Sequence, residues 1–173
     1  MITIDGGTGI IRHNGVEIAS DKMHDQWVIE SDVAMTNDTL TTWQRSSLSD
    51  AASYLTGMSH SSGIFTFPKT GVYRVDFRFG YYKSDYRRYV GALMQLSTNS
   101  GGSYFDIGRN YTHLYDVDSN NTFNNSSVFC HIDVQNASTY RMRFQVVAQA
   151  EVTVYAATDD VRTLVQFERI AST

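Results

Sequence analysis

The chain has 173 residues, enough for one domain built around a single hydrophobic core. Hydrophobic residues make up 42% of it and charged residues 18%, which excludes a disordered chain. The formal net charge of −4 argues against nucleic acid and against a membrane surface as partners, because both require concentrated positive charge. The single cysteine, Cys130, excludes an intrachain disulfide, and we interpret it as a small buried side chain.

Residues 1–22 differ from the rest, because glycines interrupt their short apolar pairs. We predict an extended N-terminal arm that lies on a neighbouring molecule, with a frayed terminus as the alternative. The candidate attachment residues are Ile2, Ile4, Ile10 and Ile11. The segment has no secretion signal, so we expect the chain to begin in the cytoplasm.

Residues 23–173 are dominated by an alternation of period two, which is typical of strands with one buried face. In the clearest run, Val72–Tyr82, Tyr73 and Phe77 are predicted to face the core. Arg74 and Asp76 then lie on the opposite face. The other predicted strands are Arg88–Ser97, Tyr104–Gly108, Val128–Val134, Tyr140–Val146, Glu151–Ala156 and Thr163–Ile170.

The turns between these strands suggest their pairing. TNSGGS after Ser97 predicts one hairpin, and the polar Asn136-Ala137-Ser138 predicts a second between its flanking strands. The one helical candidate, SLSDAASYL at residues 47–55, is short, and we interpret it as a loop or a single turn. Many short strands without helices predict an all-β sandwich or barrel.

A resemblance narrows this choice. The segment GIFTFPKTGVYRVDF begins at Gly63 and resembles the signature strand pair of the tumour necrosis factor and complement globular-head jelly rolls. The matching positions are Gly63, Phe65, Pro68, Gly71 and Tyr73. The segments VFCHIDVQNASTYRMRFQVV and TLVQFERI resemble later strands of the same fold, although the usual Gly-Asp of the turn is replaced by Ser138-Thr139. The resemblance implies an antiparallel β-sandwich jelly roll over residues 23–173.

Members of that fold typically form homotrimers, so the resemblance also implies a threefold axis beside the Val72–Tyr82 strand and the terminal strand. Residues that alternate away from the core on these strands, together with Phe129 and His131 by the same parity, are candidates for the trimer interface. They are Arg74, Asp76, Arg78, Phe129, His131, Leu164, Gln166 and Glu168. A solvated charged face is the alternative.

The segment ITIDGGTGIIRHNG and the loops rich in Asn, Ser and Tyr look like bacteriophage virion proteins that carry such domains. This resemblance implies a head decoration (cement) protein located in the virion, with the major capsid protein or another virion protein as its partner. A receptor-binding fibre tip that recognises a host glycan or protein is the alternative, although no coiled-coil or collagen-like shaft precedes the domain. A secreted signalling ligand would need the missing secretion signal.

The tyrosine-rich stretch from Tyr81 to Tyr89 is a candidate recognition loop, because exposed Tyr and Arg are frequent in binding surfaces. Its candidate residues are Tyr82, Tyr86, Arg87 and Tyr89. The alternative is a connection whose tyrosines cover the end of the sandwich.

No motif predicts catalysis or a cofactor. Asp116, Asp118 and Asn120 alternate like the oxygen ligands of a calcium loop, but the glycine and the closing acidic ligand of that loop are missing. The five histidines are scattered singly, without the spacing of a zinc site. We therefore expect no enzyme, no cofactor and no metal.

Overall fold

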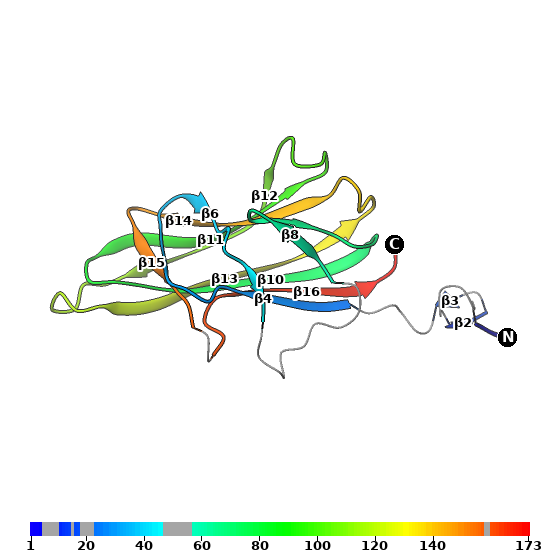
Figure 1. Cartoon of the computed structure of the whole chain (residues 1–173), viewed down its shortest axis with the longest axis horizontal. Coiled ribbons are helices and arrows are strands. Elements are labelled where there is room, and N and C mark those ends of the chain that lie inside the picture. Colours follow the sequence, from blue (N-terminus) through cyan, green and yellow to red (C-terminus); the bar gives the residue numbers. More distant parts are fainter. Residues whose placement is uncertain (5–10, 15, 18–22, 47–56, 158–159) are drawn as a thin grey trace.

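A computed structural model describes residues 1–4, 11–14, 16–17, 23–46, 57–157 and 160–173. The described residues form strands and no helix, as expected, and all strand pairs are antiparallel. Two sheets pack face to face as a sandwich, and a third, small sheet precedes them (Figure 1). The predicted segment 47–55 lies outside the described residues.

The first sheet is centred on the long strand β10. It consists of β4 (Met23–Val28), β5 (Val33–Met35), β7 (Gln44–Arg45), β10 (Gly71–Lys83), β13 (Thr122–Val134), β15 (Val152–Tyr155) and β16 (Leu164–Ala171). On one side β10 pairs with β13 along its whole length. On the other side it pairs first with β16 and then, through Gly80–Tyr82, with β15.

The second sheet is centred on β11 and β14. It consists of β6 (Asp38–Thr39), β8 (Ser59–Ser61), β9 (Ile64–Thr66), β11 (Arg87–Ser97), β12 (Phe105–Leu114) and β14 (Arg141–Ala148). The predicted hairpin around TNSGGS is confirmed, because β11 and β12 are antiparallel neighbours.

The second predicted hairpin is wrong. Strand β13 pairs with β10 in the first sheet, whereas β14 pairs with β11 in the second. The Asn136-Ala137-Ser138 turn therefore carries the chain across the sandwich from one sheet to the other. Both hairpins and crossovers use short polar turns, so the turn sequence alone does not distinguish them.

The core lies between the sheets and is aromatic. Every second residue of β10, from Tyr73 to Tyr81, is fully buried. Phe65 packs edge-on against Trp27 and Phe144, with ring centroids 5.4 and 5.5 Å apart, and lies 5.1 Å from the Phe167 ring. The predicted core parity of β10 and β16 is thus confirmed.

The signature segment is held by two glycines with positive φ. Gly63 (φ 81°) makes the turn between β8 and β9, and a Cβ there would lie 2.7 Å from the Leu40 carbonyl oxygen. Gly71 (φ 142°) begins β10, where a Cβ would lie 2.5 Å from Nε of Arg169. Only glycine meets both the backbone and the space requirement at these turns.

The arm prediction assumed one extended stretch, but the described part of the N-terminal segment folds back on itself. It forms a separate antiparallel sheet of β1 (Ile2–Ile4), β2 (Ile11–His13) and β3 (Val16–Glu17), with β2 in the middle. Met1 and Asn14 close it, because the Met1 amino group donates to Oδ1 of Asn14 at 2.7 Å. Figure 1 shows it beyond the end of the sandwich at which β16 ends. Of the candidate attachment residues, Ile2 is exposed and Ile10 lies outside the described residues.

Replacing Phe167 by Ala should lower the free energy of unfolding by about 3–5 kcal/mol, because it would leave a cavity beside the three aromatic rings that pack against Phe167. Urea unfolding followed by tryptophan fluorescence measures the change. Tyr115→Ala, which removes an exposed ring, is the matched control and should change stability by less than about 0.5 kcal/mol. Equal losses in the two variants would contradict the described core.

Cys130 should react slowly with a disulfide reagent such as DTNB near neutral pH. Burial, helped by the charge of Asp76, raises the pKa of its thiol to about 11, so little reactive thiolate is present. We expect the rate at about pH 8 to be about a hundredfold below that of the unfolded chain, measured in concentrated guanidinium chloride. Equal rates in the folded and unfolded states would show that the thiol is exposed.

Candidate functional site

The outer face of the first sheet, the side that points away from the core, carries rows of side chains that the strand register aligns. One row runs from His131 across Arg74 to Glu168. The next runs from Phe129 across Asp76 to Gln166, and the third continues through Arg78 to Leu164. The register therefore brings all eight predicted interface residues onto one face.

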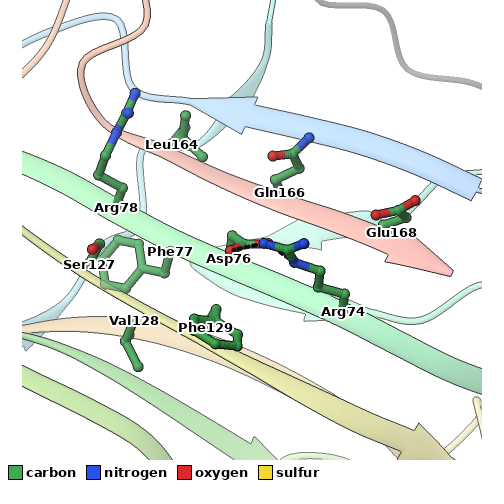
Figure 2. Close-up of a pocket in the computed structure, with 10 residues that line it drawn as sticks. All are labelled: Arg74, Asp76, Phe77, Arg78, Ser127, Val128, Phe129, Leu164, Gln166 and Glu168. Atoms are coloured by element: carbon green, nitrogen blue, oxygen red, sulfur yellow. Dashed lines mark hydrogen bonds and ion pairs between the residues drawn. The ribbon is translucent and has the colours of Figure 1, made fainter. Parts of the chain in front are cut away.

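Seven of these eight residues line a hollow in this face (Figure 2). The hollow is lined by Arg74, Asp76, Phe77, Arg78, Ser127, Val128, Phe129, Leu164, Gln166 and Glu168. His131 lies beside it, with its ring centroid 6.4 Å from that of Phe129. Prediction from parity missed Ser127, although the same alternation along β13 places it on this face.

A charge cluster occupies the middle of the hollow. Arg74 donates two hydrogen bonds to Asp76, from Nε at 2.8 Å and from Nη2 at 3.2 Å. These bonds, together with the charges of Asp76 and Glu168, raise the pKa of Arg74 above its ordinary value. The guanidinium also lies over the Phe129 ring, 5.7 Å from its centroid.

Phe129 is the apolar feature of the hollow. Its side chain is 63% exposed, although a phenylalanine on a strand is normally covered. Arg78 is held from the side by the carbonyl oxygen of Val161, to which it donates at 3.2 Å. In the part of the chain that the structure describes, neither Arg78 nor Glu168 forms an ion pair with another side chain. The face thus combines an uncovered ring with charged groups of both signs.

The predicted recognition loop is mostly not a loop. Tyr82 belongs to β10 and Tyr89 to β11, and only residues 84–86 connect the strands. The prediction that Arg87 faces a partner is wrong, because this residue is only 7% exposed and its guanidinium donates to the carbonyl oxygens of Tyr86 and Glu151. Its guanidinium anchors the connection instead of facing a partner. Tyr86 is exposed, as predicted.

Tyr82 belongs to an aromatic cluster that the sequence did not suggest. Its hydroxyl donates to Asp32 at 2.9 Å, and its ring lies 5.1 Å from Phe123 and 5.8 Å from Tyr155. The three residues come from β10, β13 and β15, so the cluster exists only once these strands pair. It extends the outer face of the first sheet beyond the hollow.

The candidate calcium loop is a tight turn. Asp118 and Ser119 both have positive φ, and the Asp116 carboxylate accepts the Ser119 amide hydrogen at 3.0 Å. Asn120 donates to the Asp118 carbonyl oxygen. No group of three His, Cys, Asp or Glu side chains within the described ranges could hold a metal ion. Those ranges also contain no helix that is long and apolar enough to cross a membrane.

Comparisons with known proteins agree with the architecture. No family model and no curated protein sequence matches the chain. Solved structures do match: Eiger TNF from S. frugiperda has a TM-score of 0.67 at 13% identity, over 88% of this chain and 94% of that chain. Murine APRIL at pH 5.0 has a TM-score of 0.62 at 11% identity, over 87% and 100% of the two chains. Murine APRIL at pH 8.5 has a TM-score of 0.57 at 12% identity, again over 87% of this chain and 100% of that chain.

At such low sequence identity the structural similarity shows the fold and nothing about function. Residues 23–173 were predicted to form a jelly roll of the tumour necrosis factor type, and these structural neighbours confirm that fold. The likeness to phage virion proteins stays a prediction.

Proposed function

We propose that the chain is a non-enzymatic structural protein that assembles as a homotrimer through the outer face of its first sheet. The observation that carries this proposal is the exposed Phe129 ring, set in a hollow of opposite charges. Covering that ring with another subunit removes its apolar surface from water, which favours association by about 1.5–3 kcal/mol per ring.

The charges suit a symmetric contact. Arg78 and Glu168 have no ion pair within the described chain, so each is available to a neighbouring copy. Opposite charges that meet across subunits fix the register of association and disfavour wrong partners. In a trimer two different parts of this face meet, and such a heterologous contact closes into a ring when the rotation between neighbouring copies divides a full turn.

The trimer would act as a decoration protein of a phage head. Strands β1, β2 and β3 support this role, because among the described residues they form a sheet of their own and add no strand to the sandwich. In that sheet β1 and β3 are edge strands, and an edge strand can pair with a strand of another protein. Three such segments on one trimer would strengthen weak contacts through effective concentration.

A receptor-binding fibre tip is the second candidate. The turn between β12 and β13 exposes Tyr115 and Val117, at 63% and 54%. Exposed apolar side chains on a tight turn are suited to contact with a host molecule.

Asp76→Arg should convert the trimer to a monomer, because it removes the partner of Arg74 and places three arginines at successive outward positions of β10. Sedimentation velocity measures the assembly state, and circular dichroism verifies the fold. Asp106→Arg makes the same charge change on the second sheet and should leave the trimer intact. A folded Asp76→Arg protein that remains trimeric would place the axis elsewhere.

Co-sedimentation with undecorated phage capsids tests the attachment role. The full-length protein should bind capsids, and a variant lacking residues 1–22 should stay in the supernatant while remaining a trimer. Capsid binding by the shortened variant would refute attachment through this segment. Binding to host cells, with none to capsids, would favour the fibre tip.

A further inference from the structure

The outer face of the second sheet carries a cluster of tyrosines and arginines that the trimer interface does not use. Tyr89 of β11 and Tyr111 of β12 meet edge to face, with ring centroids 5.7 Å apart. The guanidinium of Arg88 lies 5.8 Å from the Tyr89 centroid, and that of Arg109 lies 5.8 Å from the Tyr111 centroid. We call these four residues the Arg–Tyr cluster.

The Tyr111 ring approaches the neighbouring strand closely because that strand has a glycine opposite it. Gly91 is the register partner of Tyr111. A Cβ at Gly91 would lie 2.4 Å from Cδ1 and 2.7 Å from Cε1 of that ring, so any side chain there would displace it. Tyr111 remains 45% exposed. The strands thus hold a half-exposed aromatic ring, the platform, beside the guanidinium of Arg109.

The strands of this part of the second sheet carry more positive than negative charge. The strands β11, β12 and β14 carry five arginines and one carboxylate, in a chain whose net charge is −4; these are Arg87, Arg88, Arg109, Arg141, Arg143 and Asp106. Asp106 contacts Arg109 and accepts a hydrogen bond from Gln95 at 2.7 Å. Arg88 and Arg143 form no ion pair with any described residue.

We propose that the Arg–Tyr cluster is a binding site for a carbohydrate that bears a carboxylate. The C–H bonds of a sugar ring present partial positive charge, which the negative face of the Tyr111 ring attracts. A carboxylate on the sugar accepts charge-assisted hydrogen bonds from the guanidinium of Arg88 or Arg109. The inference goes beyond the assembly role and does not depend on it, because the two sheets turn their outer faces in opposite directions.

An acidic peptide needs only positive charge for binding, whereas a sugar also uses an exposed aromatic ring. The presence of the ring therefore favours a sugar. A single-stranded nucleic acid needs successive rings along a basic groove, whereas these two rings meet edge to face. Both alternatives are included in the test below.

Binding of the full-length protein to sialyllactose and to oligogalacturonate is measured by calorimetry, with neutral lactose as the comparison. Both acidic sugars should bind and lactose should bind at least about tenfold more weakly, since it lacks the carboxylate. Affinity should fall as salt is raised. Polyglutamate and oligothymidylate serve as the competing anions, and both should bind more weakly than the acidic sugars.

Two variants locate the site. Tyr111→Ala should weaken binding of the acidic sugars at least about tenfold by removing the platform, and Arg88→Gln should reduce the preference for them over lactose. The matched controls are Phe105→Ala, which removes an exposed ring at the start of β12, and Lys69→Gln, which changes the charge equally on the turn before β10. Circular dichroism and the assembly state show whether each variant is folded.

Three results would overturn the proposal. These are the absence of binding to both acidic sugars, equal affinity for lactose, and unchanged affinity in folded Tyr111→Ala and Arg88→Gln. Stronger binding of polyglutamate or oligothymidylate would assign the cluster to an acidic peptide or to nucleic acid instead. Failure to trimerise would test the proposed function separately, because sugar affinity of the single subunit does not require the trimer.

Discussion

The structure depends on one strand that serves two surfaces. Residues Gly71–Lys83 of β10 place fully buried aromatic side chains on one side and Arg74, Asp76 and Arg78 on the other. Because the side-chain period of a strand is two, a slip of one residue would bury the charges and expose the rings. The large aromatic core thus fixes the register of β13 and β16, and with it the rows of the hollow.

This constraint gives the sandwich two outer faces of different character. The first presents Phe129 among charges of both signs, which suits contact with identical copies. The second presents tyrosines and an excess of arginine, which suits an anionic ligand. Since the faces are separated by the thickness of the core, association through one leaves the other accessible.

Arginine has three distinct roles in this chain, and its environment decides which one applies. Arg87 is buried and binds backbone carbonyl oxygens, so it supports a connection between strands. Arg74 is paired with Asp76 in the hollow. Arg88 is exposed over a tyrosine ring and has no carboxylate partner among the described residues. Neighbouring positions in the sequence, such as Arg87 and Arg88, therefore differ completely in environment.

The sequence by itself determined the all-β class, most strand positions, the buried parity of β10 and β16, and the set of residues on the outer face, because alternation is a local property of a strand. It did not determine which sheet each strand joins, so the polar turn after β13 predicts a hairpin although β13 and β14 belong to different sheets. It also missed the burial of Arg87 and the clusters around Tyr82 and Tyr111. Those features arise from contacts between strands far apart in the chain, which only the tertiary structure brings together.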